Sequence, residues 1–215
     1  MVIRYLGHSS FLIKVSEGTI VTDPFDPDKV GLPFPKVSAD IVLLTHDHLD
    51  HNNVEAVSGE PFVIRSPGEY EISDIKVWGY PTFHDKKGGA ERGKNTIYVF
   101  EAEKLTVCHL GDLGHLLDEK TAEEISGSDI LLIPTGGVYT LDHEEAAKAA
   151  AQLEPKIIIP MHFKVSGMKE GFKDLSEVSA FLEEMGVTGA EIQDKLKVSK
   201  ASLPEEPEVI VLKHG

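Results

Sequence analysis

The sequence predicts a layered α/β fold, and three features support this prediction. Short runs of apolar and β-branched residues, bounded by turn residues, dominate the first third of the chain and recur later. Two segments, near residues 142 and 174, have the apolar spacing of helices. Three runs, at 39–46, 128–135 and 156–162, are continuously apolar and end in polar residues, which suits strands covered on both faces.

The expected strands follow these runs in order. The first third of the chain predicts strands at residues 2–6, 11–15, 19–22, 41–44, 62–65 and 75–80. Later runs predict strands at residues 96–100, 105–110, 130–133, 156–159 and 209–212. The polar residues 101–104 lie between two of these runs and indicate a hairpin.

Two helices are expected in the second half of the chain. The first covers residues 142–153, where Asp142 can cap the first turn and Glu145 is placed as its capping-box partner. The second covers residues 174–185 and ends at Gly186, a residue typical of helix C-termini.

Length and composition fit one globular domain over residues 1–215. A chain of 215 residues can bury a core without disulfides, and its 41% hydrophobic and 27% charged residues are ordinary for a globular protein. The first residues lack the apolar stretch of a signal peptide, and no run approaches the ~18 apolar residues of a membrane span. We therefore expect a cytoplasmic protein without a membrane partner.

The charge balance argues against nucleic acid as a partner. The chain has 21 basic and 36 acidic residues and a formal net charge of -15, which repels a phosphate backbone. A local basic patch on an acidic protein could still bind nucleic acid. A small-molecule substrate is the expected partner, and the oligomeric state stays open.

The run at 39–46 leads into the most polar cluster of the chain, His46-Asp47-His48-Leu49-Asp50-His51. In an extended strand exit, residues two apart point the same way, so His46 and His48 can face one point while Asp47 faces elsewhere. Asp50 and His51 belong to the next turn and face a second point. The spacing therefore predicts a metal site with room for two ions.

This cluster resembles the HxHxDH signature of the metallo-β-lactamase superfamily, and the other motifs of that superfamily follow in order. Asp23 resembles its early aspartate, which supports the metal loop. The resemblance implies a four-layer αββα sandwich with two metal ions at one edge and a bridging hydroxide that hydrolyses the substrate. The ligands that it implies are His46, His48 and His84 for the first ion, Asp50, His51 and His162 for the second, and Asp112 as the bridge.

Residues 5–11, 111–114 and 134–140 look most like the branch of ascorbate-6-phosphate lactonase-like hydrolases. That resemblance implies a metal-dependent hydrolase of a small ester-type substrate, a lactone or a phosphodiester, without fixing which. Five histidines and two carboxylates without a thiolate suit Zn²⁺ first, with Mn²⁺ or Fe²⁺ as alternatives. A bound dication lowers the pKa of water to about 7, and Asp50 is also placed to orient the resulting hydroxide.

Further candidates surround these ligands. His109 and His115 lie three residues to either side of Asp112, so either could protonate a leaving group, the alternative being a supporting or surface histidine. His8 is open to the same two interpretations and is a candidate for substrate binding. Gly137, in a pair of glycines, could direct a backbone N–H at an anion, although a tight turn explains it equally.

The segment 84–95 predicts a flap over the site. It contains four basic and two acidic residues and three glycines. Its cations could hold a phosphate or carboxylate of the substrate, which would then be anionic, and Lys94 and Asn95 are its substrate-binding candidates. The alternative is an ordinary solvated loop.

Three other functions compete with this hypothesis. A ribonuclease of the same superfamily would use the same metals, but the net charge and the lack of a long inserted domain argue against it. A persulfide dioxygenase keeps HxHxDH with a single iron. A metal-dependent scaffold without turnover is the third alternative.

Overall fold

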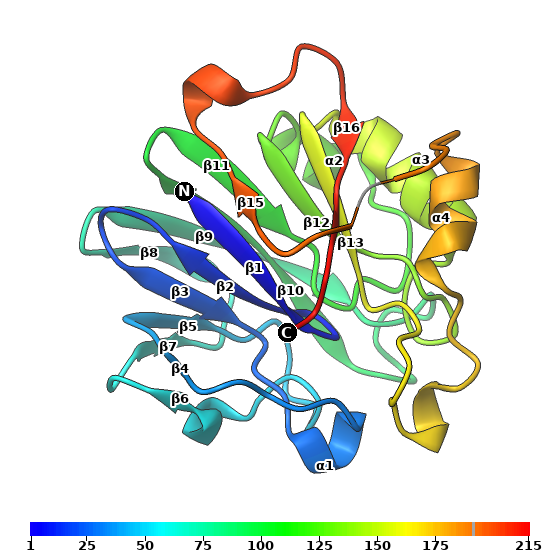
Figure 1. Cartoon of the computed structure of the whole chain (residues 1–215), viewed down its shortest axis with the longest axis horizontal. Helices are drawn as coiled ribbons and strands as arrows, with labels where there is room; N and C mark the ends of the chain where they lie inside the picture. The colour runs from blue at the N-terminus through cyan, green and yellow to red at the C-terminus, as the bar shows by residue number, and fades with distance from the viewer. Residues whose placement is uncertain (191) are drawn as a thin grey trace.

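The computed structural model describes residues 1–190 and 192–215 and has two mixed β-sheets packed face to face (Figure 1). The main hydrophobic core lies between the sheets, with Ile3 and Tyr5 from the first sheet and Val77 and Phe100 from the second. The next residue along the first strand, Arg4, points outward and is exposed. This alternation is the period-two pattern from which the strands were predicted.

The first sheet places strands that are far apart in the sequence side by side. Its order among the described residues is β15 (Leu196–Lys197), β1 (Val2–Gly7), β2 (Ser10–Lys14), β3 (Thr19–Thr22), β5 (Ile41–Leu43) and β7 (Phe62–Ile64). The pairs from β15 to β3 are antiparallel, and the pairs β3–β5 and β5–β7 are parallel.

The second sheet combines a parallel half with an antiparallel half. Its order is β16 (Glu208–Val209), β13 (Ile157–Met161), β12 (Ile130–Pro134), β11 (Leu105–His109), β10 (Lys94–Ala102), β9 (Ile75–Phe83) and β8 (Gly68–Ile72). Two small parallel pairs flank the large sheets: β4 (Val37–Ser38) with β6 (Val57–Ser58), and β14 (Ile192–Gln193) with β17 (Val211–Leu212).

Helices cover mainly the second sheet. The helices α2 (Glu119–Ile125), α3 (His143–Leu153) and α4 (Val178–Glu184) contribute to a core that lies against β11 and β12. Single 3₁₀ turns lie at η1 (Val54–Ala56), η2 (Glu170–Phe172) and η3 (Lys200–Ser202).

The predicted two-sheet α/β sandwich is confirmed, but its two outer layers differ: the layer outside the first sheet contains little helix. The outer face of the first sheet packs against β4, β6 and their connections, and the helix α1 (Pro27–Val30) before them is only one turn long. Pro33 and Pro35 follow that turn, and because proline has no N–H to donate, they prevent the helix from continuing.

Most of the predicted elements are confirmed, including the hairpin. The strands β10 and β11 pair antiparallel through the two residues Glu103 and Lys104, which have φ of 52° and 63°, as a tight primed turn requires. The start predicted for the second helix is wrong. The backbone of Ser176 instead accepts a hydrogen bond from Lys164 and donates one to Gly136, so α4 begins only at Val178.

Two further differences concern the later part of the chain. The strand predicted at 209–212 is divided between two sheets, because Ile210 donates its N–H to Ile158 while Val211 pairs with Ile192. The helix α2 was not predicted, although Asp118 caps it by accepting a hydrogen bond from the Thr121 N–H.

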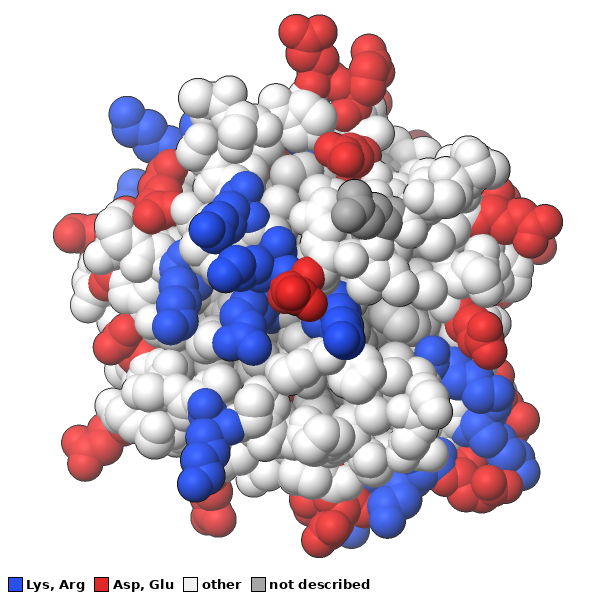
Figure 2. Space-filling model, viewed as in Figure 1, with Lys and Arg blue, Asp and Glu red and all other residues white. Residues whose placement is uncertain are grey.

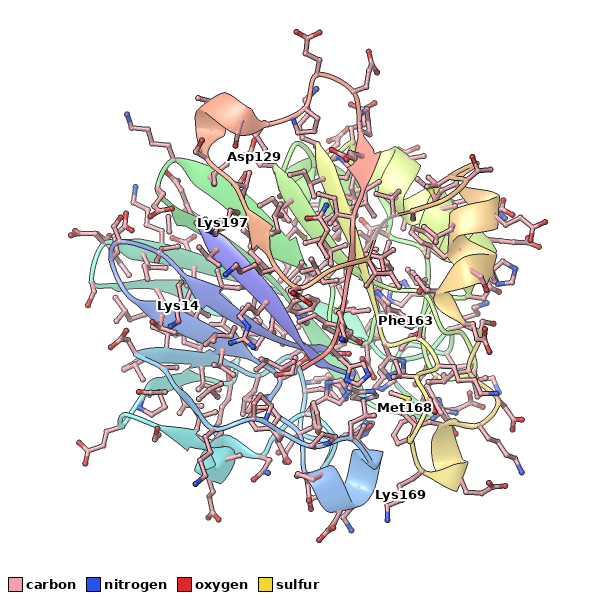
Figure 3. The ribbon with its side chains drawn as sticks, viewed as in Figure 1. Lys14, Asp129, Phe163, Met168, Lys169 and Lys197 are labelled. Carbon is pink, nitrogen blue, oxygen red and sulfur yellow. The ribbon has the colours of Figure 1, made fainter. Side chains whose placement is uncertain are left out.

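Basic side chains gather on the face that carries β1, β2 and β15 (Figure 2). Lys14 and Lys197, labelled in Figure 3, both lie beside Val2 at the start of β1. The other end of β1, at Gly7, is five residues and about 17 Å away at 3.3 Å per residue. Among the described residues, no helix is long and apolar enough to cross a membrane.

The capping box of α3 leads to a stability prediction. Asp142 accepts a hydrogen bond from the Glu145 N–H, and Glu145 accepts one from the Asp142 N–H. We expect Asp142→Ala to lower the free energy of unfolding by about 1 kcal/mol, because a first-turn N–H loses its acceptor. Denaturant unfolding measures this change. Glu144→Ala, an exposed substitution in the same turn, is the control, and an equal loss in both variants would contradict a specific cap.

Candidate metal centre

The predicted ligands come together where strands of both sheets end. His46, His48, Asp50 and His51 lie in the loop after β5, and the other three lie at the ends of three strands of the second sheet. His84 follows β9, Asp112 follows β11 by three residues, and His162 follows β13. Two of the three similar apolar runs thus deliver ligands, while the third, β12, leads into Gly136.

His46, His48 and His84 form the first group. Their ligand nitrogens all lie within 4.8 Å of one another, and the ring centroids of His46 are 4.5 Å from His48 and 4.8 Å from His84. Asp47 points away and accepts a hydrogen bond of 2.7 Å from Asn52. This is the arrangement that the alternation in the loop predicts.

A carboxylate oxygen of Asp112 occupies the middle of the cluster. From Asp112 Oδ2 the Nε2 atoms of four histidines are 3.1 Å (His84), 3.2 Å (His51), 3.3 Å (His162) and 3.9 Å (His46) away. His46 Nε2 and His51 Nε2 are nevertheless buried without a hydrogen-bond partner in the described part of the chain. These nitrogens and the carboxylate converge without hydrogen bonds that satisfy the nitrogens, so this donor set fits metal ions.

The second group lies on the other side of Asp112. His51 and His162 lie there with a third buried histidine, His8, and the ligand nitrogens of these three are also within 4.8 Å of one another. Asp50 Oδ2 is 3.8 Å from His51 Nε2 and 3.2 Å from His8 Nε2. The predicted ligands Asp50, His51 and His162 are therefore brought together, and His8 joins them.

Asp23 supports the metal loop from beneath. Its carboxylate accepts hydrogen bonds from the Thr45 N–H at 2.8 Å, the Thr45 hydroxyl at 2.7 Å and His51 Nδ1 at 3.1 Å. Thr45 Oγ1 also lies 3.0 Å from His46 Nδ1. Because the Nδ1 atoms of both imidazoles are engaged, their Nε2 atoms are directed at the cluster.

Close backbone approaches fix the other ligands. A side chain at Gly114 would place its Cβ 2.4 Å from the His84 backbone, and one at Gly136 would place it 2.1 Å from the His162 carbonyl oxygen. Only glycine allows these contacts. The glycines in the motifs at 111–114 and 134–140 thus allow the close contacts that position His84 and His162.

The buried charges shift one another's pKa. Burial alone would raise the pKa of Asp112, but His162 and His51 hold it well below its usual range. Burial alone would lower the pKa of His51, but Asp112 and Asp23 raise it well above 6.5. Burial lowers the pKa of His46 and His48, and it lowers the pKa of His8 to about 4. In the metal-free protein, His51 therefore holds a proton at neutral pH.

Several predicted catalytic and substrate contacts need correction. His109 donates from Nε2 to the Ser9 carbonyl and accepts at Nδ1 from the Gly111 N–H, so the ring is fully used and cannot transfer protons. His115 contacts the Leu116 carbonyl and does not line either cavity beside the ligands. His109 therefore supports the backbone of Ser9 and Gly111, and His115 lies outside both cavities.

Two substrate-binding candidates are also explained by the fold. Asn95 is buried, donates to the Leu110 carbonyl and the Thr82 hydroxyl, and accepts from the Asp112 N–H, so it positions Asp112. Gly137 donates its N–H to the Leu141 carbonyl and forms a turn with φ of 68°. Neither residue has a free group for a substrate.

The segment predicted as a flap is folded around Asp85. This carboxylate accepts four backbone N–H groups, and although burial alone would raise its pKa, those of Arg92, Lys87, Glu91 and Gly89 lower it to about 2. The segment is therefore a compact loop held by its own hydrogen bonds, rather than the extended flap that was expected. Two of its four cations also have partners: Lys86 pairs with Glu145 and Lys87 with Glu91.

The remaining cations face the site. A cavity of about 190 Å³ borders His48, Asp50 and Asp112 and is lined by Arg92 and Tyr139. A groove of about 560 Å³ continues from His48 and Arg92 to Lys94 and Arg65. The Arg92 guanidinium lies 4.5 Å from the centre of the Tyr139 ring. Lys94, a substrate-binding candidate from the sequence, lines this groove together with Arg65, which no sequence motif indicated.

Comparisons with known proteins agree with this geometry. A sequence model described as "Beta-lactamase superfamily domain" matches residues 2–162. The chain is 32% identical to a UPF0173 metal-dependent hydrolase of Staphylothermus marinus over 82% of this chain and 91% of that protein. It is 29% identical to one of Thermococcus onnurineus over 80% of this chain and 91% of that protein.

A solved structure is also similar over the whole chain. It is a candidate Zn-dependent hydrolase of the metallo-beta-lactamase superfamily from Thermotoga maritima, 39% identical, with a TM-score of 0.82. The match covers 100% of this chain and 99% of that one.

The raised pKa of His51 predicts proton release on metal uptake. An ion can bind only the deprotonated nitrogen, so zinc binding at pH 7 should displace the His51 proton and should weaken as the pH falls. Calorimetric titration in buffers of different ionisation enthalpy counts the protons released. Asp23→Asn should release fewer protons, because it removes a charge that raises the His51 pKa and leaves other proton sources unchanged. Equal release in both proteins would refute this assignment.

Proposed function

The chain belongs to the beta-lactamase superfamily domain family, and from this premise we propose that it is a metal-dependent hydrolase that uses two divalent ions on a small anionic ester. Zinc is the metal that we propose, because the donor set is imidazole and carboxylate without thiolate. A lactone or a phosphodiester is the proposed substrate class. The relatives' printed descriptions support hydrolysis and leave the substrate open.

One observation supports two ions in particular. Asp112 Oδ2 lies between two compact groups of histidines, close to members of both, and the Nε2 atoms of His46 and His51 have no other partner among the described residues. A single ion would use one group and leave the nitrogens of the other unsatisfied. Two ions, one held by each group with Asp112 near both, would satisfy both groups.

The chain's own residues then bind and orient the substrate. When bound, two dications would lower the pKa of water towards neutral and would stabilise negative charge that develops on the substrate. Burial opposes ionisation of Asp50, but its hydrogen bond from His8 holds the Asp50 pKa well below the usual range. Asp50 is therefore ionised. Its carboxylate can accept a hydrogen bond from a water or hydroxide and so orient it, whereas it has no proton with which to act as a general acid.

The positive charge that lines the groove suits an anionic substrate. Arg92 is fixed by its backbone N–H on Asp85 and by the Tyr139 ring, so its guanidinium is presented in a defined direction. Lys94 and Arg65 extend the positive charge along the groove and are exposed. In a chain of net charge -15, such a local cationic groove favours a phosphate or carboxylate on the substrate.

Metal stoichiometry tests the dinuclear centre. We expect two zinc ions per chain, and Asp112→Asn should weaken both, because a shared carboxylate oxygen is replaced by a poorer ligand. Elemental analysis and zinc titration measure this. Asp47→Asn, in the same loop but directed away from the cluster, should leave both ions in place. Loss of one ion only in Asp112→Asn would show that Asp112 is not the bridge.

Substrate charge can be tested within one loop. The zinc-loaded protein is assayed on lactones, phosphodiesters, thioesters and a short RNA, and a complete lack of turnover would overturn the hydrolase proposal. Arg92→Gln should raise the KM for anionic substrates about tenfold or more, since a hydrogen bond to a charged group is worth about 1.5–3 kcal/mol. Neutral esters should change little.

Lys86→Gln and Lys87→Gln are the matched controls, because both lysines already pair with carboxylates. They should have little effect on either class of substrate. An equal rise in KM for neutral and anionic substrates in Arg92→Gln would mean that the groove does not select charge.

A further inference from the structure

His8 is a fully buried histidine beside the second metal position. Its Nε2 lies 3.2 Å from Asp50 Oδ2 with hydrogen-bond geometry. Its ring packs on those of His162 and His51, at centroid distances of 4.3 and 4.8 Å, and against the edge of Phe172 at 5.1 Å. The histidine therefore contacts three proposed ligands and has no access to solvent.

The backbone of His8 makes a second connection to the same position. Its φ is 55°, in the left-handed region that non-glycine residues seldom occupy. The carbonyl oxygen accepts two hydrogen bonds of 2.7 Å, from the His162 N–H and from the Tyr5 hydroxyl. His162 is itself left-handed, with φ of 52°, so this contact holds two strained residues together.

We propose that His8 is a positioning residue for the second metal ion, with its side chain fixing Asp50 and its carbonyl fixing His162. The inference rests on the dinuclear centre proposed above. Asp50 and His162 come from different sheets, after β5 and β13, and no sequence-local contact could set their distance. His8, at the turn between β1 and β2, connects both ligands through a single residue.

The rival role for His8 is that of a direct ligand, since its nitrogen also lies within 4.8 Å of those of His51 and His162. The contact with Asp50 favours the positioning role. An ionised carboxylate can only accept, so the proton of this bond lies on His8 Nε2, and to bind an ion His8 would have to give up both this proton and its hydrogen bond to Asp50. His51 Nε2 is different: it lies 3.2 Å from Asp112 without a hydrogen bond.

Two amide substitutions separate these roles. The Gln side-chain nitrogen can replace Nε2 of histidine, so His8→Gln keeps a donor for Asp50. The Asn amide is too short to reach Asp50, but Asn tolerates φ near 55°, so His8→Asn preserves the backbone contact to His162. Metal-free forms of both variants and the wild type are titrated with zinc against a chromophoric chelator, without substrate, and their thermal midpoints are compared.

We expect His8→Asn to bind the second zinc ion about 10–100-fold more weakly, as is usual when a ligand loses its supporting hydrogen bond, with the first ion unchanged. His8→Gln should recover most of the loss. If His8→Gln binds as weakly as His8→Asn, the imidazole is itself a ligand and the proposal is wrong. Unchanged affinity in both variants also overturns it.

The same titration separates this inference from the proposed function. A wild-type protein that binds only one ion would overturn both the dinuclear centre and the role of His8. Two bound ions, with the expected difference between the variants but no turnover of any substrate, would overturn the hydrolase proposal alone.

Discussion

The structure is organised around one buried carboxylate. Asp112 is 2% exposed, and a lone ionised carboxylate at that depth would be strongly destabilised. Imidazoles surround it, but burial lowers the pKa of His46 and of the nearby His8, so these two do not carry compensating protons at neutral pH. A bound divalent metal ion would resolve this conflict, because it would neutralise the carboxylate and use imidazole lone pairs at the same time. The cluster and its metals are therefore one electrostatic unit.

Holding such a unit requires rigid supports, and the fold provides them at strand ends. Asp23 joins the backbone of Thr45 to the ring of His51, and Asn95 holds the backbone of Asp112. Both supports reach between segments that follow different strands. Left-handed backbone at Asp23, with φ of 38°, shows that this arrangement is maintained against local conformational preference. Preorganised ligands of this kind bind metal without a large ordering cost.

Local spacing made part of this predictable from the sequence. The alternation of His46, Asp47 and His48 after an apolar strand predicted that His46 and His48 face one point, and the capping box at Asp142 predicted α3. Contacts between distant segments could not be predicted in the same way. No local pattern shows that His8 reaches Asp50 or that Arg65 lines the groove, since each depends on how two sheets pack.

The errors have the same origin. His109 was attractive because it lies three residues from Asp112, but a strand end directs residues at that spacing to different surroundings, and its ring instead holds the Ser9 carbonyl. Asn95 and Gly137 were assigned to the substrate from their neighbours in sequence, and both use their polar groups within the protein. Spacing predicts which side chains share a direction, whereas hydrogen bonding decides which remain free.

A continuous series of contacts connects Arg92 in the groove to His8 beside the histidine cluster. Arg92 packs on Tyr139, and the Tyr139 hydroxyl donates to the Gly171 carbonyl, which fixes the turn carrying Phe172. The Phe172 ring in turn packs against the His8 ring, which is bonded to Asp50. If Arg92 holds a substrate anion as proposed, that anion would rest on the same packed chain of residues that contacts Asp50. Because these contacts are continuous and the loop around Asp85 is closed, the fold itself fixes the position of Arg92 relative to Asp50, and with it the distance that the proposed substrate would span.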